Sequence, residues 1–379
     1  MIKRPDLFKS LNRCITENPV TTLLGPRQCG KTTIARTICE PAPVHYYDLE
    51  NPADRSGLSN PLMALGNMDG LIILDEIHRM PELYETLRVL VDDTSHHASY
   101  LILGSASPGI VRDVSETLAG RIGFVDMGGF NLKEVSPDNW ERLWLRGGFP
   151  KSYLAADEDS SFRWRDNFAR TFLERDLRQF GFSIHPESMR RFWIMVAHYH
   201  GQIWNAAEFA RSLGRDEKTA RNYLDILSGA LVVRQLQPWH VNIKKRQVKS
   251  PKIYIRDSGI LHSLLSIRTR RDLLSHIKAG ASWEGFALEQ ILSVTGDRDA
   301  YFWSTHGGAE LDLLLSPEGA RLGFEFKFTD SVRTTKSMRI AIEDLELKHL
   351  YIIHPGVRSY QIDANISALS IFNLISTLS

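Results

Sequence analysis

Cysteine is scarce in this sequence, and long apolar runs are missing. The 379 residues include three cysteines, Cys14, Cys29 and Cys39, an odd number without the paired spacing of a metal site. Such usage is typical of free thiols in a reducing compartment. The longest uncharged apolar stretches, such as residues 71–74, have the length of a strand, whereas a membrane span needs roughly 20 residues. The basic N-terminal segment is not followed by the apolar segment of a signal peptide, so we expect a cytoplasmic protein with no membrane partner.

An excess of either charge is also lacking, because 46 Lys and Arg balance 45 Asp and Glu and leave a formal net charge of +1. The field of the whole molecule therefore does not indicate a nucleic-acid-binding protein, and local basic patches must carry that argument. Hydrophobic residues make up 43% of the chain and charged residues 24%, which excludes the disordered and fibrous classes. At ~100 to 200 residues per domain, the length predicts two or three domains.

The most specific motif is GPRQCGKT at residues 25–32, which fits the phosphate-binding loop G-x-x-x-x-G-K-[ST] at every position. An apolar strand, residues 20–24, precedes it and a helix follows, as phosphate binding by backbone N–H groups and a helix dipole requires. Lys31 would reach the β- and γ-phosphates of ATP, and Thr32 would place its hydroxyl on Mg²⁺. The alternative is a chance match in a glycine-containing loop. The residues expected at the nucleotide are Gly25, Pro26, Arg27, Gln28, Cys29, Gly30, Lys31, Thr32, Thr33 and Asp75.

A second apolar strand, residues 70–74, ends in the two carboxylates Asp75 and Glu76. A continuous apolar run is typical of a buried parallel strand in a nucleotide-binding sheet. Asp75 would hold Mg²⁺ through water, and Glu76 would act as the general base on the attacking water. Such a strand end can also be simply solvated, but here it lies downstream of a matching phosphate loop.

A third apolar strand, residues 100–103, leads to Ser105 and Ser107. Ser105 is a candidate sensor of the γ-phosphate with Ser107 next in line, and the alternative is an ordinary strand-to-loop turn. Helical spacing of apolar residues over 81–91 predicts a crossover helix, so strand and helix alternate as in a parallel α/β sheet. Arg121 is a candidate finger toward the γ-phosphate of a neighbouring subunit, which would require a homo-oligomer, or else a surface residue at a helix end.

The middle of the chain predicts helices followed by a winged helix. Residues 140–183 have apolar residues at helical spacing and favour an α-helical lid or connector. Residues 205–214, from the N-cap Asn205 to the terminating Gly214, and residues 216–227 predict a helix-turn-helix. Apolar segments 230–236 and 251–256 would form the wing around the basic turn 244–249, which together with Lys252 suits contact with DNA phosphates. The alternatives are a rigid lid, an oligomer contact and a solvated tip.

The last third predicts a helix and a sheet that carry charged residues. Residues 283–292 predict an amphipathic helix with Phe286 and Ile291 facing inward. Segments 301–303, 310–315 and 323–328 alternate with period two and are separated by glycine-containing turns, which predicts an antiparallel meander.

Three charged residues of these strands form the D…E-x-K arrangement of restriction-endonuclease-like nucleases, and a fourth lies on the preceding helix. Asp312 and Glu325 would bind Mg²⁺, and Glu284 on the preceding helix would complete or flank the metal shell. Lys327 would position the attacking water or stabilise the developing phosphate charge. Because the motif is short, the alternative is that these side chains face water on a half-exposed sheet.

The chain resembles the prokaryotic AAA-superfamily ATPases that carry a C-terminal restriction-endonuclease-like domain of unknown function. The resemblance is carried by an ordered set of segments: GPRQCGKT, LIILDE, GSAS, LAGR, GGFP, PKIYIRDSGI, ELD and EFK. The resemblance runs over essentially the whole chain. It implies an ATP-binding protein with Lys31, Thr32, Asp75 and Glu76 at the nucleotide. Cys29 stands where a small aliphatic residue is usual, and the sensor strand carries fewer hydroxyls, but neither departure removes a group that the site needs.

These observations together predict an α/β fold class, with a P-loop AAA-type parallel sheet and helices, then a winged helix and an α/β restriction-endonuclease-like domain. The expected boundaries are 1–135 for the ATPase core, 136–190 for the helical connector, 191–258 for the winged helix and 259–379 for the last domain. The first functional hypothesis is an ATPase that couples Mg²⁺-dependent hydrolysis of ATP to ADP with DNA engagement, the question of nuclease activity being open. The alternative is a nucleotide-switched scaffold or sensor with slow turnover, whose C-terminal domain only binds protein or nucleic acid.

Overall fold

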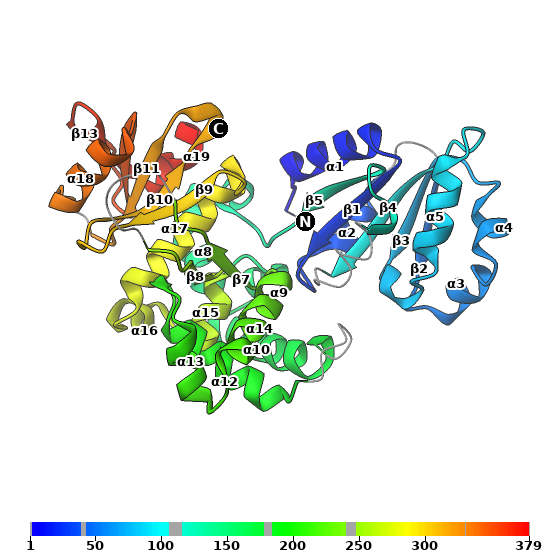
Figure 1. Cartoon of the computed structure of the whole chain (residues 1–379), viewed down its shortest axis with the longest axis horizontal. Helices are drawn as coiled ribbons and strands as arrows, with labels where there is room; N and C mark the ends of the chain where they lie inside the picture. Colours follow the sequence, from blue (N-terminus) through cyan, green and yellow to red (C-terminus); the bar gives the residue numbers. More distant parts are fainter. Residues whose placement is uncertain are drawn as a thin grey trace. The chain divides into compact units, whose positions relative to one another are not determined.

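The computed structural model describes residues 2–38, 43–105, 116–177, 184–239, 248–329 and 331–378. The chain divides into two compact units, one of residues 1–129 with 229–231 and one of residues 130–228 with 232–379 (Figure 1). Each unit is described by itself. Within the described ranges, no helix has the length and apolar character needed to cross a membrane. The finer boundaries at residues 135, 190 and 258 stay predictions.

The first unit is built on a sheet of five parallel strands in the order β2-β3-β4-β1-β5. The strands are β1 (Val20–Gly25), β2 (Val44–Asp48), β3 (Leu71–Asp75), β4 (Ser99–Ser105) and β5 (Ile122–Asp126). The predicted parallel α/β sheet is therefore confirmed, with β2 and β5 added at its edges. Since all five strands run the same way, the ends of β1 and β3 lie at one edge of the sheet, where the phosphate loop begins.

Helices of the first unit pack against this sheet, and those between β2 and β4 share an apolar core with it. The helices are α1 (Pro5–Glu17), α2 (Lys31–Ala35), α3 (Pro52–Gly57), α4 (Pro61–Leu65), the 3₁₀ turn η1 (Ile77–Arg79) and α5 (Leu83–Asp92). The predicted crossover helix is confirmed as α5, which buries Leu83, Leu87 and Leu90. These leucines share a core with Ile72 of β3 and Ile102 of β4.

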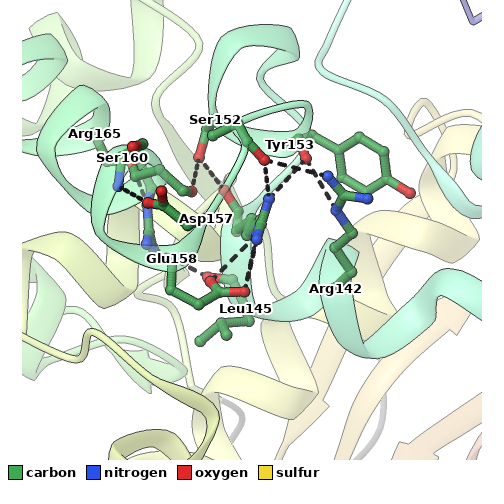
Figure 2. Close-up of polar contacts among 11 residues, drawn as sticks. Arg142, Leu145, Ser152, Tyr153, Asp157, Glu158, Ser160 and Arg165 are labelled. Atoms are coloured by element: carbon green, nitrogen blue, oxygen red, sulfur yellow. Dashed lines mark hydrogen bonds and ion pairs between the residues drawn. The ribbon is translucent and has the colours of Figure 1, made fainter.

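The second unit begins with a helical region held together by buried arginines. Its elements are α7 (Leu132–Val135), η2 (Pro137–Asn139), α8 (Trp140–Arg146), α9 (Pro150–Tyr153), α10 (Glu158–Thr171) and the π-helical turn η3 (Phe172–Asp176). Figure 2 shows how arginines of α8 and α10 donate to carbonyls of the neighbouring turns, with Arg165 donating to the carbonyl oxygens of Leu145 and Gly259 at 3.0 Å each. The expectation of a helical region here is confirmed for the described residues.

Three helices and a small antiparallel sheet come next along the chain. The helices are α12 (Pro186–His198), α13 (Ala206–Leu213) and α14 (Glu217–Gly229), and the strands β6 (Gln202–Ile203), β7 (Val233–Leu236) and β8 (Lys252–Ile255) pair in the order β6-β8-β7. The side chain of Asn205 accepts the N–H of Glu208 at 3.3 Å, and Gly214 ends α13 with a φ of 64°, as predicted. Residues 244–247 of the predicted basic turn lie outside the described residues.

The C-terminal sheet has six strands in the order β13-β14-β12-β11-β10-β9. Its strands are β9 (Ala300–Ser304), β10 (Glu310–Leu315), β11 (Leu322–Phe326), β12 (His349–His354), β13 (Tyr360–Asp363) and β14 (Ile366–Ser370). The predicted antiparallel meander is confirmed for β9, β10 and β11, but β12 and β14 continue the sheet in parallel, so the whole sheet is mixed. Helices α15 (Ser258–Leu264), α16 (Arg270–Ser275), α17 (Ala279–Thr295), α18 (Lys336–Leu345) and α19 (Leu374–Leu378), with the turns η4 (Pro317–Gly319) and η5 (Ile371–Asn373), complete the unit.

The helix expected to be amphipathic is buried on most of its circumference, so that expectation is wrong. Helix α17 buries ten of its residues, including Gly285, Leu288 and Leu292, which lie outside the arc from Phe286 to Ile291. A helix that is buried all round loses the polar stripe from which an amphipathic pattern is recognised. Glu284 is therefore carried into the interior of the unit rather than toward solvent.

Candidate functional site

The loop between β1 and α2 has the backbone that a phosphate-binding loop needs. A Cβ on Gly25 would lie 2.3 Å from the carbonyl oxygen of Met127, and Gly30 has a φ of 106°, which favours glycine strongly. Cys29 is buried beneath the loop, whereas the side chains of Gln28 and Thr33 are exposed. The first turn of α2 has backbone N–H groups with no partner inside the helix, and these are the donors that bind phosphate in such loops.

The Lys31 side chain points back into this loop. Its Nζ donates to the carbonyl oxygens of Gly25 at 2.9 Å and Pro26 at 3.0 Å, and its side chain is buried. The ammonium is thus held at the loop by two neutral carbonyl oxygens. Charged phosphate oxygens can take their place and would form stronger hydrogen bonds with it.

The predicted Mg²⁺ residues Thr32 and Asp75 are brought together by the structure. The Thr32 hydroxyl donates to Oδ2 of Asp75 at 2.8 Å, across from the end of β3. The Tyr46 hydroxyl of β2 donates to the same oxygen at 2.5 Å, and the guanidinium of Arg36 lies over the Tyr46 ring. Burial raises the pKa of Asp75, and the hydrogen bonds from Tyr46 and Thr32 offset part of that rise. Tyr46 is a residue that sequence reasoning missed, because β2 itself carried no recognised pattern.

Glu76 follows β3 in a left-handed backbone conformation, with φ 57° and ψ 45°. Its Oε2 lies 3.2 Å from Nδ1 of His78. Burial alone would raise the pKa of Glu76, but the close contact with His78 and the positive charges of Arg27 and Lys31 outweigh it, so the pKa is lowered. The carboxylate is therefore ionised at neutral pH, which a general base requires. His78 is a second residue that the sequence did not single out.

The remaining ATPase candidates lie apart from this group or outside the description. Ser105 ends β4 opposite Gly25, but its side chain is not among the described parts, and Ser107 lies outside the described residues. Arg121 precedes β5, at the edge of the sheet opposite the phosphate loop, and forms a bidentate ion pair with Asp92 at 2.6 and 2.9 Å. Its role toward a neighbouring subunit stays a prediction, which would require that this pair open.

The second unit gathers the predicted nuclease-like residues around an additional lysine. Nζ of Lys252, from β8, lies 3.0 Å from Oδ1 of Asp312 and 3.4 Å from Oε1 of Glu284. The Tyr254 hydroxyl donates to the same Glu284 oxygen at 2.6 Å. Burial and the charge of Asp312 raise the pKa of Glu284 to about 7. The sequence placed Tyr254 only in a wing strand and counted Lys252 with the basic cluster suited to DNA phosphates. That prediction for Lys252 is wrong, because its side chain is buried against two carboxylates.

Glu325 and Lys327 occupy the neighbouring strand end, as the period-two spacing predicts. Nζ of Lys327 lies 3.0 Å from Oε2 of Glu325. Burial and the charge of Asp312 raise the pKa of Glu325 to about 8, so Asp312 acts on both glutamates. The alternative of a solvated sheet face does not hold here, because Asp312 and Glu325 are both buried.

Five acidic and basic groups are therefore assembled in the second unit, but they do not form a ready metal site. Among the described residues, no three His, Cys, Asp or Glu side chains come together in a group that could hold a metal ion. The predicted metal-ligand roles of Asp312 and Glu325, and the flanking role of Glu284, stay predictions.

Comparisons with known proteins match successive parts of the chain. Residues 17–136 match the AAA domain family, residues 137–271 a domain of unknown function, DUF8612, and residues 279–374 another, DUF4143. Uncharacterized protein Rv2008c of Mycobacterium tuberculosis and uncharacterized protein Mb2031c of Mycobacterium bovis are each 47% identical to this chain over 377 residues, covering 100% of it and 86% of their own length. Among solved structures, the Walker-type ATPase PABY2304 of Pyrococcus abyssi is similar over 70% of this chain and 96% of its own, with 15% identity and a TM-score of 0.49.

Proposed function

The chain belongs to the family of these two mycobacterial proteins and contains an AAA-type ATPase domain, and on that premise we propose that it couples Mg²⁺-dependent ATP hydrolysis to DNA engagement by its second unit. The observation that carries the first part is the 2.8 Å hydrogen bond between Thr32 and Asp75, with Lys31 and Glu76 directly beside them in sequence. It joins the two motifs on which phosphoryl transfer depends.

The donor set at this place fits a magnesium ion. Hydroxyl and carboxylate oxygens are the ligands that Mg²⁺ prefers, and Thr32 and Asp75 would hold it directly and through water. When bound, the ion would neutralise charge on the β- and γ-phosphates. Lys31 exchanges the Gly25 and Pro26 carbonyls for phosphate oxygens. Glu76, ionised at neutral pH, accepts a proton from the attacking water.

The ATPase proposal is tested by replacing one residue of each role. Lys31→Ala is expected to abolish turnover by loss of phosphate binding, and Glu76→Gln to retain ATP binding while turnover falls at least a hundredfold. Lys9→Ala, at an exposed position outside the site, is the matched control for loss of a lysine. Turnover that is unchanged in both site variants would contradict the proposal.

DNA engagement is proposed from the order of elements α12, β6, α13, α14, β7 and β8, which agrees with the winged helix expected from the sequence. Arg215 and Lys218, before and at the start of α14, are exposed and suit phosphate contacts. Binding of duplex DNA should weaken steeply with salt, and Arg215→Ala with Lys218→Ala should reduce both affinity and salt slope. Lys151→Ala, an exposed lysine of α9, serves as the control. Binding that is insensitive to salt would refute this part.

A second candidate role for the second unit is binding without cleavage, which the position of Lys252 between Asp312 and Glu284 favours. The test compares cutting of DNA and RNA with Mg²⁺ or Mn²⁺, with and without ATP, in wild type and in an Asp312→Ala, Lys327→Ala double variant. Metal-dependent cutting that disappears in the variant would establish a nuclease. ATP turnover without any cutting would instead support binding alone.

A further inference from the structure

The carboxylate cluster of the second unit contains a cation that belongs to the chain itself. The Lys252 ammonium is 3.0 Å from an Asp312 oxygen and 3.4 Å from a Glu284 oxygen, and the face of the Phe302 ring lies 5.9 Å away. Its side chain is 5% exposed. A buried charge is stable only when its partners compensate the loss of hydration, and two carboxylates do so here.

The backbone on both sides of the cluster is arranged around this contact. Strand β10 changes register between Leu311 and Leu314, so that Asp312 lies in a bulge of its pairing with β9. Bulges redirect side chains, and this one directs Asp312 toward Lys252, while its second oxygen accepts the N–H of Phe326 at 3.3 Å. Tyr254, two residues after Lys252 on β8, fixes Glu284 from the same side.

We propose that Lys252 fills the cation position of the Asp312 and Glu284 carboxylates, so that the native chain binds no divalent metal at this cluster. A magnesium ion touches its oxygen ligands at about 2.0–2.1 Å, and it would have to occupy the volume between the two oxygens that the ammonium already holds. Ammonium and metal ion would also repel each other strongly at that separation in a buried place. The cluster therefore acts as an anchor between β8 and the C-terminal sheet.

This inference rests on the nuclease-like interpretation of the second unit. It adds that the nuclease-like carboxylates are paired with a lysine of the chain instead of a metal ion. The predicted E-x-K lysine, Lys327, pairs with Glu325 and is 39% exposed, so it leaves the Asp312 side of the cluster to Lys252. Because Lys252 begins β8, a strand of the predicted wing, any event that draws β8 away would uncover the carboxylates. Metal-dependent chemistry at this cluster would then require displacement of Lys252.

The test measures Mn²⁺ uptake by the full chain without nucleotide, from the loss of the free-ion electron paramagnetic resonance signal. Four proteins are compared: wild type, Asp312→Asn, Lys252→Met, and Lys252→Met with Asp312→Asn. The difference in Mn²⁺ uptake between a protein and its Asp312→Asn counterpart reports binding at this cluster. Binding at the ATPase site is the same in both proteins and drops out of the difference. Lys327→Met is the matched control, since it removes a lysine from the other carboxylate.

Wild type and Asp312→Asn should take up Mn²⁺ equally, whereas Lys252→Met should gain about one Asp312-dependent ion per chain with at least tenfold higher affinity. Lys327→Met should behave as wild type. Asp312-dependent uptake in wild type, or none in a folded Lys252→Met, would overturn the inference. If Lys252→Met fails to fold, wild type against Asp312→Asn decides the question alone. A Lys252→Met protein that binds Mn²⁺ without cutting DNA would refute nuclease activity while upholding the resident cation, and ATP turnover reports separately on the ATPase proposal.

Discussion

Replacing Arg146 should destabilise the second unit far more than replacing Arg142, although the two arginines share acceptors. Both guanidinium groups donate to the carbonyl oxygens of Tyr153 and Ala155, as Figure 2 shows for Arg142. Arg146 is buried and also holds Glu158 through Nε at 3.1 and 3.2 Å and Nη2 at 2.8 Å, whereas Arg142 is exposed. The pair of variants Arg146→Met and Arg142→Met therefore compares a buried arginine that also holds Glu158 with an exposed arginine that shares its carbonyl acceptors.

The expected loss for Arg146→Met follows from its partners. The ion pair contributes about 0.5–1 kcal/mol, because the Glu158 side chain is 40% exposed and its charge is screened by water. The Ala155 carbonyl loses a charged donor at 2.6 Å, which costs about 1.5–3 kcal/mol when no water replaces it. Methionine keeps part of the aliphatic stem, so the total is about 3 kcal/mol. Arg142→Met should cost less than about 1 kcal/mol, since water replaces its contacts.

The assay is urea unfolding followed by tryptophan fluorescence. All eight tryptophans lie between residues 140 and 303, within the second unit, so the signal reports that unit alone. For a unit of this size, about 3 kcal/mol corresponds to a fall in Tm of about 6–12 °C. If Arg146→Met loses no more stability than Arg142→Met, the buried guanidinium does not hold this region and the reasoning is refuted.

Three further changes test the site and the pH response. Tyr46→Phe removes a hydrogen bond that lowers the pKa of Asp75, so this pKa should rise. The acid limb of the ATPase rate profile should then move to higher pH. A limb that stays in place would contradict the hydrogen bond between Tyr46 and Asp75. Gly25→Ala should abolish binding of a fluorescent ATP analogue, since its Cβ meets the Met127 carbonyl, while Gly57→Ala, with nothing within 4 Å, should bind as wild type. Burial lowers the pKa of His262 to about 3, against about 6.5 when unfolded, so the contribution of His262 to the stability of the second unit should fall as pH drops below about 6.5. His262→Gln should remove this contribution and change the slope of the urea midpoint against pH relative to wild type, and an unchanged slope would count against a neutral buried histidine.

The sequence predicted those parts of the site whose chemistry is contiguous. The loop from Gly25 to Thr32 and the strand end at Asp75 each fit in one short segment, so their residue types and spacing fix the geometry locally. Tyr46 escaped because its partner Asp75 lies 29 residues away and only the pairing of β2 with β3 brings them together. No periodicity within β2 contains that information.

The C-terminal sheet shows the complementary limit. Its three antiparallel strands were predicted because turns and alternation are local signals, whereas the parallel partners β12 and β14 are joined through long connections. Helix α17 was misjudged for a related reason. Its burial on most sides depends on elements such as α15, β11 and α19 that pack around it, and these are not visible in its own pattern.

In both units a motif supplies the acidic groups and a strand from elsewhere supplies the partner that sets their state. Asp75 receives a hydroxyl from β2, which leaves it free to accept a metal-bound water; Asp312 receives an ammonium from β8, 60 residues away, which neutralises it. The two carboxylates are equivalent in the sequence, since each ends or interrupts an apolar strand and each belongs to a motif associated with Mg²⁺. The D…E-x-K spacing therefore cannot distinguish a metal-dependent nuclease from a neutralised cluster. What distinguishes them is whether the cation beside Asp312 comes from solvent or from the chain, and here the chain provides it.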